Sequence, residues 1–463
     1  MTNRHISIAV SAMVALTLAG CATGTTTPTG HAETNQAVIT KPAKSDLNNT
    51  HKTPEVFGER KFPYPYKAML ALSSDADHMT LRKFNLIHEF LNTKEKTPFG
   101  YYGLGLDVSD SFFMYNGQNL PQIVDYGHKP MKDELTYFKG ISSTPYGKSV
   151  IDHYIQSGWL DTLHSYGDFS QVNPHHTLFS RALANQAVSA LKAAGDNVTV
   201  WTDHGNMSNV DNFGSYGVSK FYTYQQGANP HSPYYHTNLT IPYGVHFVWA
   251  DRSSDVFSRR TTLYPIQLQD GRHVWGFWRY TDSGITRHQT EWNWSIGGLS
   301  AQLSQTHLNQ LIAQHGYAIV AQHFYALNTK LPLPGNAIDA LWRLADEYNH
   351  GNILVARESR LLNYNVLQQY VTYDVTYAKG VAYIHVRSIR DPVFGTYVPT
   401  VADLHGITFY TTNPAQTVLE IGNTRIPQSD LQDNPSDGLY PSIGVKWFAP
   451  DTKNYAVTAP GVF

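Results

Sequence analysis

The sequence predicts an α/β protein in which an irregular (β/α) barrel of seven or eight units is followed by a small all-β sandwich domain. Three observations lead to this prediction. Short apolar runs that end in polar residues alternate with amphipathic segments over about 300 residues, as parallel strands joined by helices do. No glycine-rich phosphate-binding loop follows an early strand, which counts against an open nucleotide-binding sheet. After about residue 366 the apolar pattern changes to period two, which is typical of strands with one buried face.

The composition narrows the range of partners. The chain has 463 residues, a formal net charge of -2 and only 15% charged residues. It therefore lacks the basic surface that nucleic acid requires, and we expect no nucleic-acid partner. Aromatic residues make up 13% of the chain, with 30 Tyr and 9 Trp. Aromatic faces with few charges suit a surface that stacks on sugar rings, and they equally suit a large aromatic core.

The amino-terminal segment has the features of a secretory signal. Arg4 and His5 precede an apolar run over residues 6–18, which is too short to span a bilayer and ends in small residues. The motif Leu18-Ala19-Gly20-Cys21 resembles the lipobox of bacterial lipoproteins, which implies cleavage before Cys21 and lipid on its sulfur. Ala22 follows, where an aspartate would mark retention in an inner membrane. We therefore expect a membrane-anchored lipoprotein of the bacterial cell envelope, in the outer membrane where the cell has two.

Four segments follow from these patterns. Residues 22–56 are rich in Thr, Pro, Ala and Lys and contain almost no large apolar side chain, so they cannot bury a core. We expect a signal peptide, then a lipidated Cys21 with a flexible tether, then the barrel as the catalytic domain, then the β-sandwich. Their predicted boundaries are 1–20, 21–56, 57–365 and 366–463.

The opening strand of the barrel sets the pattern for the others. Its apolar run, Met69–Leu72, leads into Asp75-Ala76-Asp77-His78, and apolar residues at helical spacing follow. Six later apolar runs also end in polar or ionisable residues and are predicted to be strands: 99–106, 159–163, 198–201, 245–249, 274–278 and 317–321.

The remaining elements are predicted from periodicity and from glycine stops. Gly195 and Gly316 stand where helices should end. The predicted helices are 148–157, 181–194, 299–315 and 337–348, with a last barrel strand at 353–356. The predicted strands of the sandwich are 371–377, 381–386, 406–411, 417–421 and 443–448.

A barrel brings the carboxyl ends of its strands to one mouth, where polar side chains can form a site. The candidates there are Asp75, Asp77, His78, His164, Asp168, His204, Asp251, Arg279 and His323. His164 and Asp168, with an aspartate from a neighbouring strand, could supply three ligands and leave a position for water, as catalytic zinc requires. Each residue also has an ordinary structural interpretation, because an aspartate can cap a helix and a buried histidine can simply be hydrogen-bonded.

These residues resemble the polysaccharide deacetylases, metal-dependent carbohydrate esterases with an irregular (β/α) barrel. The resemblance rests on order and spacing over about residues 60–365. Asp75 and Asp77 match a first-strand pair of aspartates, with Ala76 inserted between them. His164-Ser165-Tyr166-Gly167-Asp168 matches a His-Ser-x-x-His motif, with Asp168 in place of the second histidine, and His323 matches a last-strand histidine. The arginine-proline motif of the middle strands is not recognisable.

The resemblance implies roles for these positions. Asp75 would be the general base and His323 the general acid, and Asp77, His164 and Asp168 would bind a divalent metal. Zinc is the first expectation. Manganese, nickel and cobalt are alternatives, because the carboxylate of Asp168 shifts the site toward metals that prefer oxygen ligands. We expect substrate contacts from His204, Trp201, Trp249 and Arg279. The substrate would be a cell-surface or extracellular polysaccharide, with N- and O-acetyl groups both open.

Two other functions remain open. A metal-independent glycoside hydrolase would need two carboxylates at the mouth, and Asp75 with Asp251 or Asp203 could serve. A non-catalytic lipoprotein could instead bind polysaccharide on a degenerate barrel. The substitution at Asp168 and the missing arginine motif both fit that last reading.

Overall fold

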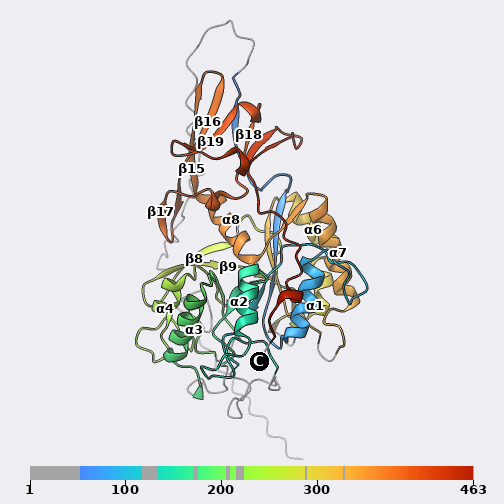
Figure 1. The fold of residues 1–463 in the computed structure, drawn as a ribbon, viewed down its shortest axis with the longest axis vertical. Helices are drawn as coiled ribbons and strands as arrows, with labels where there is room; N and C mark the ends of the chain where they lie inside the picture. The colour runs from blue at the N-terminus through green and yellow to red at the C-terminus, as the bar shows by residue number, and fades with distance from the viewer. Residues whose placement is uncertain are drawn as a thin grey trace, which may run out of the picture. The chain divides into compact units, whose positions relative to one another are not determined.

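A computed structural model describes residues 53–116, 133–169, 176–204, 209–214, 224–286, 289–326 and 329–461. All of them belong to one compact unit, residues 37–463. They form a mixed α/β protein with several sheets and helices (Figure 1). The predicted signal peptide, Cys21 and nearly all of the tether lie outside the described residues.

Two sheets of mainly parallel strands form the α/β part. Within them only β8 runs antiparallel to its neighbour. In spatial order, the first sheet contains β14 (Ile353–Val355), β2 (Ala68–Ser74), β13 (Tyr317–Gln322), β10 (Arg279–Tyr280) and β7 (Ser253–Ser254). The second contains β3 (Asp110–Phe112), β4 (Leu160–His164), β5 (Val200–Thr202), β6 (Phe247–Trp249), β9 (His273–Phe277) and β8 (Leu263–Gln267).

The two sheets touch at both sides. Strands β9 and β10 are separated only by Trp278, so one stretch of chain takes part in both sheets. On the other side, the Ser111 hydroxyl on β3 donates a hydrogen bond to the Ser74 carbonyl on β2, at 2.8 Å. Backbone pairing among the described strands does not run in a closed ring. The structure thus establishes a mixed α/β fold, and the closed barrel remains a prediction.

The helices largely follow the predicted pattern. They are α1 (Leu81–Asn92), α2 (Lys148–Ser157), α3 (Arg181–Ala194), α4 (Thr237–Tyr243), α5 (Leu299–Gln302), α6 (Gln305–Ala313), α7 (Gly335–Asn349) and α8 (Glu358–Tyr370). Helix α3 ends at Gly195 with φ +74°, as predicted. The single helix predicted over 299–315 is wrong. The chain breaks there because the Ser304 side chain accepts the His307 N–H and begins a new helix.

The strand predicted at 99–106 is also wrong. Gly100 and Gly105 have φ values of +88° and +65°, which lie outside the β region. A Cβ atom at Gly103 would lie 2.4 Å from the Thr93 carbonyl oxygen. These glycines therefore allow the segment to pack closely against the end of α1, and β3 takes the place beside β4.

Two further sheets are built mainly from the carboxyl-terminal strands, which lie in the upper part of Figure 1. The first contains β1 (Val56–Arg60), β18 (Thr408–Thr411), β22 (Ser442–Val445) and β21 (Leu431–Asn434). The second contains β15 (Val371–Ala378), β16 (Val381–Asp391), β19 (Thr417–Ile421) and β20 (Thr424–Arg425), with β17 (Gly395–Tyr397) beside β16.

The two ends of the described chain cross the predicted domain boundaries. Strand β1 pairs antiparallel with β18, so the first described strand belongs to a sheet of late strands. Helix α8 runs to Tyr370, past the predicted boundary at residue 366. The last residues return to the α/β part, where Nε2 of His153 lies 3.1 Å from the Tyr455 carbonyl oxygen.

Side chains along the parallel strands alternate between two apolar clusters. On β2, Leu70 and Leu72 belong to one cluster, and Met69 and Ala71 belong to the other. The second cluster also takes the alternate residues of β13, β6 and β9, and apolar residues of α8. Because side chains alternate with period two, positions 75 and 77 continue the side of Met69 and Ala71. The strand sequences thus direct the polar residues toward one shared interior.

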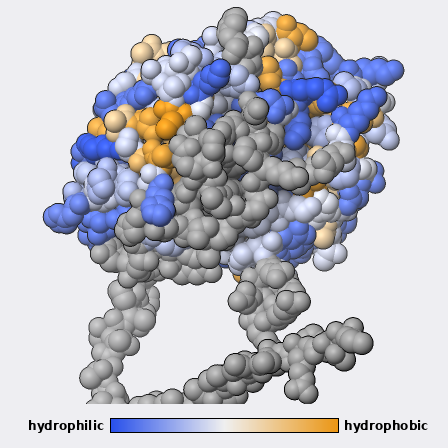
Figure 2. Space-filling model, turned by 90° about the horizontal axis from the view of Figure 1, so that it is seen from below, coloured by the Kyte–Doolittle hydropathy of each residue, from blue (hydrophilic) through white to orange (hydrophobic). Residues whose placement is uncertain are grey.

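Figure 2 shows one face of the molecule, coloured by hydropathy. That face, seen from below in Figure 1, is mainly hydrophilic with scattered apolar patches. Among the described helices, none combines the length and the apolar character needed to cross a bilayer.

Candidate metal and catalytic centre

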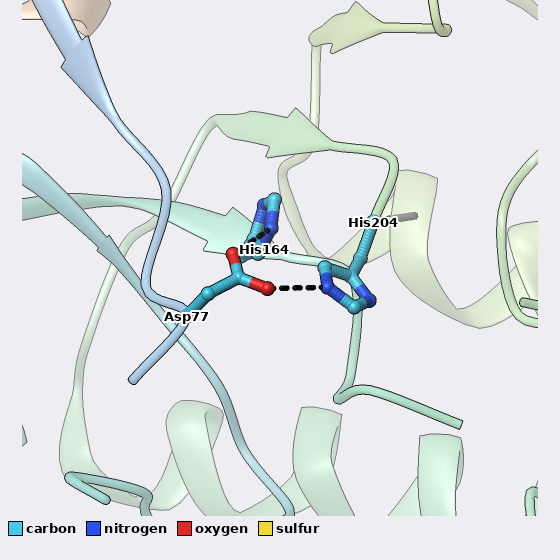
Figure 3. Close-up of side chains that lie close together, drawn as sticks. All are labelled: Asp77, His164 and His204. Atoms are coloured by element: carbon cyan, nitrogen blue, oxygen red, sulfur yellow. Dashed lines mark hydrogen bonds and ion pairs between the residues drawn. The ribbon is translucent and has the colours of Figure 1, made fainter. Parts of the chain in front are cut away.

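Asp77 lies at the centre of a cluster formed by strand ends. Its Oδ1 lies 2.7 Å from Nε2 of His204, and its Oδ2 lies 3.2 Å from Nε2 of His164 (Figure 3). Asp77 follows β2, His164 ends β4, and His204 follows β5. Each residue offers one ligand atom, and these atoms lie within 4.8 Å of one another. Such a group can hold one metal ion.

The chemistry of these residues fits a divalent metal. Asp77 Oδ2 and both ring nitrogens of His164 are buried and make no well-aligned hydrogen bond among the described residues, although Asp77 Oδ2 and His164 Nε2 are only 3.2 Å apart. Burial lowers the pKa of His164, against the pull of the nearby carboxylates, so its ring is neutral, as a metal ligand must be. Two imidazole nitrogens and one carboxylate suit zinc and leave a position for water, and the same donors also bind manganese, nickel or cobalt.

The structure gives the third position of this group to His204 rather than to Asp168. The described residues offer a second possible metal-binding group, Asp75, Asp77 and His323, and Asp168 belongs to neither group. Its Oδ1 lies 3.4 Å from Nδ1 of His204. The ligand set of Asp77, His164 and Asp168 stays a prediction, and the geometry favours His204 over Asp168 beside Asp77. Carboxylates behind a metal-binding histidine orient its ring and raise its basicity, and Asp168 lies where it can do this. His204, predicted to bind substrate, follows β5 at the spacing of Val200 and Thr202, a signal that sequence reasoning could have used.

Asp75 is held by a buried arginine. Nη2 of Arg279 lies 2.7 Å from Asp75 Oδ1, and Arg279 is completely buried. Its guanidinium lies over the ring of Trp249, 4.5 Å from the centroid. Burial alone would raise the pKa of Asp75, but the charge of Arg279, with help from the neighbouring imidazoles, outweighs it and holds the pKa below its usual value. Asp75 is therefore ionised, and Arg279 positions it instead of lying open to substrate as predicted.

His323 approaches the same pair of aspartates. Its Nε2 lies 3.5 Å from Asp77 Oδ2 and 4.0 Å from Asp75 Oδ2, and its Nδ1 lies 3.0 Å from the Trp294 carbonyl oxygen. Burial would lower the pKa of His323, but the aspartates and the carbonyl raise it above its usual value. Its side chain is 24% exposed. A protonated, partly exposed imidazole can give a proton to a leaving group.

Three residues of the cluster region have left-handed backbone conformations that residues other than glycine rarely adopt. They are His78, Ser165 and Asp251, with φ values of +55°, +48° and +52°. His78 follows Asp77, and Ser165 follows His164. Each such conformation costs about 1–3 kcal/mol, and such strain gathers at functional sites. The strand ends thus carry strain where the candidate ligands are presented.

Two buried glutamates near the cluster were not predicted. Glu134 accepts a hydrogen bond from the His78 N–H at 2.9 Å. Glu358, at the start of α8, accepts hydrogen bonds from Ser73 at 3.1 Å and Thr162 at 3.3 Å. Burial raises the pKa of each carboxyl to about 8. A glutamate in the first turn of a helix usually has a structural role at the helix terminus, so no sequence pattern indicated that Glu358 is buried.

The Glu358→Gln variant should change how stability depends on pH. The raised pKa means that folded Glu358 keeps its proton at pH 5–7.5, whereas the unfolded chain loses it. This group's contribution to the unfolding free energy should therefore fall by about 1.4 kcal/mol per pH unit in that range. Glutamine does not titrate. In denaturant unfolding of metal-free protein, the unfolding free energy of the variant relative to the wild type should therefore increase as pH rises. Parallel pH profiles of the two proteins would contradict the assignment.

The tryptophans divide between core and site. Trp201 is completely buried in the apolar core, and its Nε1 donates to Asp203 at 2.8 Å. It cannot make the predicted contact with substrate, because its side chain lies on the outer side of β5, in the apolar core. Trp249 lies beside Arg279 and is 6% exposed. Trp294 was not predicted, yet it is partly exposed and its ring lies 6.4 Å from that of His323.

Asp203 and Asp251 lie at the ends of β5 and β6. Asp203 accepts hydrogen bonds from Trp201 and from the Phe213 N–H, and burial raises its pKa to about 7. Asp251 accepts a hydrogen bond from Gln225. Burial and the neighbouring Asp203 hold the pKa of Asp251 well above its usual value. Both environments favour the protonated carboxyl.

Comparisons with family models, with curated proteins and with solved structures gave no match to this chain. The resemblance to the polysaccharide deacetylases therefore rests on the residues described above.

Proposed function

We propose that this protein is a metal-dependent polysaccharide deacetylase with an irregular (β/α) barrel of the kind that carbohydrate esterases use. One observation carries the proposal. Asp77, His164 and His204 form a possible metal-binding group. Beside it lie Asp75, whose pKa Arg279 holds below its usual value, and His323, whose pKa the aspartates raise above its usual value. This arrangement offers a metal, a base and an acid in one place.

Each residue has a defined part in hydrolysis of an acetyl group. A divalent metal held by Asp77, His164 and His204 would polarise the acetyl carbonyl and acidify a water molecule. Asp75 accepts a proton from that water, whose oxygen forms the new bond to the acetyl carbon. Arg279 keeps the Asp75 carboxylate ionised and oriented. His323 gives its proton to the departing sugar nitrogen or oxygen as its bond to the acetyl carbon breaks.

The setting of the enzyme is part of the proposal. Two partly exposed aromatic rings flank His323 and could contact a sugar near the acid, Tyr325 at 5.7 Å and Trp294 at 6.4 Å between ring centroids. The lipobox-like segment at Cys21 supports attachment to a membrane of the cell envelope. We therefore propose that the substrate is a cell-surface or extracellular polysaccharide.

Removal of the metal should abolish deacetylation. Metal stabilisation of developing charge contributes several kcal/mol, so a strong chelator should lower kcat by about 10²–10³-fold. Acetate release from acetylated polysaccharides, measured before chelation, after it and after adding zinc, manganese, nickel or cobalt, tests this. Full activity in the chelated protein, with metal analysis showing none bound, would refute the proposal.

A glycoside hydrolase is the second candidate, because two carboxyl groups here have opposite protonation states. Asp75 is kept ionised, whereas Asp251 is kept protonated and is partly exposed. A base and an acid with separated pKa values are what glycoside hydrolysis needs. Release of reducing sugar that survives chelation would favour this function over deacetylation.

A further inference from the structure

A cavity lies at the opposite ends of the strands from the candidate metal centre. Its volume is about 540 Å³, and its lining includes Thr199, Phe247 and Trp275. The first two lie at the amino ends of β5 and β6, whose carboxyl ends lead to His204 and Asp251. Side chains of α8, of the β16–β17 turn and of the late chain close the cavity. Small-molecule sites have about this volume and often lie between parts of a fold.

Aromatic rings dominate the walls of this cavity. Phe394 and Tyr397 are 40% and 42% exposed, and Trp447 and Phe448 are partly exposed. The Phe394 ring is held against that of His246, with 4.4 Å between centroids. Large exposed rings in a cavity that also has polar side chains suit a ligand with both apolar faces and hydroxyl groups.

The charged groups of the cavity already have partners within the protein, the arginine in an ion pair and the carboxylates in hydrogen bonds from uncharged donors. Asp391 accepts hydrogen bonds from Trp275 Nε1 at 3.2 Å and from two backbone N–H groups, one of them that of Phe394. It thereby fixes the turn that presents Phe394. Arg360 binds Asp107 at 2.7 Å, and its guanidinium lies over the Phe448 ring, 3.8 Å from the centroid.

The remaining carboxylate, Asp403, accepts hydrogen bonds from the N–H and hydroxyl of Thr400 at 2.7 and 2.8 Å. A negatively charged ligand would therefore find no free cation among these groups and would face two carboxylates. The cavity favours a neutral ligand over an anionic one.

We propose that this cavity binds neutral sugar units of a polysaccharide at a site separate from the metal centre. The choice of a polysaccharide rests on the proposed function, whereas the neutral, ring-stacking character rests on the cavity itself. A polymer bound at both places would be held more tightly than at either alone, because the second contact is intramolecular. The cavity would thus retain the polymer while the metal centre acts on its acetyl groups.

The test measures binding in the Asp75→Asn background, which prevents turnover. The probes are hexasaccharides of N-acetylglucosamine, N-acetylgalactosamine, glucose and mannose, with a uronic acid hexasaccharide as the charged comparison, titrated by calorimetry into the full chain in detergent. At least one neutral probe should bind, and the charged probe should bind more weakly. Phe394→Ala and Tyr397→Ala should each weaken that binding about tenfold. Tyr101→Ala, at a ring that is 52% exposed outside the cavity, is the matched control and should leave it unchanged.

The outcomes separate this site from the metal centre. Failure of all four neutral probes, or binding that neither cavity variant weakens, would overturn the proposal. Loss of binding in Tyr101→Ala to the same extent would also overturn it, because the effect would not be local. The protein with Asp75 intact is also assayed for acetate release. If it releases none but binding still depends on Phe394 and Tyr397, the sugar site is upheld and the deacetylase function is refuted.

Discussion

Replacing Asp75 with asparagine should lower kcat for deacetylation by about 10³-fold and leave the metal content unchanged. Asparagine keeps the size of the side chain and can still accept a hydrogen bond from Arg279, whose Nη2 lies 2.7 Å away. It cannot take a proton from water. Asp75 lies outside the group of Asp77, His164 and His204 but belongs to the second possible group, with Asp77 and His323. A metal held by the first group should bind as before, whereas loss of metal from Asp75→Asn would place the metal in the second group. Acetate release and metal analysis on the same preparation measure both quantities.

Asp251→Asn is the control variant for this experiment. Asp251 is also a carboxylate at a strand end, but it is bonded to Gln225 and kept protonated. In a deacetylase that uses Asp75 as its base, Asp251→Asn should retain most of its activity. Equal loss of sugar-releasing activity in both variants would instead indicate two catalytic carboxylates and a glycoside hydrolase. Full acetate release by Asp75→Asn would refute the assignment of the base.

The sequence predicted the framework of the site because strand ends leave a strong local signal. An apolar run that stops at Asp75 and Asp77 needs only the period of a strand to place both carboxylates on one side. His164 and His323 follow by the same reasoning from β4 and β13. The structure brings all four together.

The errors have physical causes that a pattern of apolar residues does not contain. The segment at 99–106 is apolar enough for a strand, but Gly100 and Gly105 adopt positive φ values there. Trp201 was predicted to contact substrate because it is an aromatic residue at the end of a strand, but it lies one position from the inward-facing residues of β5. A shift of one residue turns a side chain to the other face of a sheet.

Long-range partners were the least predictable part of the site. Arg279 lies 204 positions from Asp75, and nothing near either residue indicates their pairing. Glu358 enters the interior from the start of α8, where a helix-terminal role was the ordinary expectation. Asp168 and His204 could each have been the third ligand from spacing alone, because only the folded chain shows which side chain reaches Asp77.

His204→Ala should abolish stoichiometric metal binding, whereas Asp168→Asn should weaken it by only about 10–100-fold. The difference follows from geometry. Nε2 of His204 lies 2.7 Å from Asp77 Oδ1, inside the possible metal-binding group, and Asp168 faces the other ring nitrogen of His204 at 3.4 Å. Removing the first deletes a ligand, and neutralising the second only alters the orientation and basicity of that ligand. Equilibrium dialysis against buffered zinc, followed by metal analysis, measures both affinities.

His323→Gln is the matched comparison, because it removes an imidazole that lies outside the group of Asp77, His164 and His204 but inside the group of Asp75, Asp77 and His323. With the metal in the first group, this variant should keep wild-type zinc affinity and lose activity, since its proposed role is to give a proton to the leaving group. Loss of zinc from this variant would place the metal in the second group. Circular dichroism of each variant separates loss of metal from loss of fold. Stoichiometric zinc in folded His204→Ala, with none in Asp168→Asn, would restore the ligand set predicted from the sequence. It would also mean that binding metal draws Asp168 toward Asp77 and displaces His204.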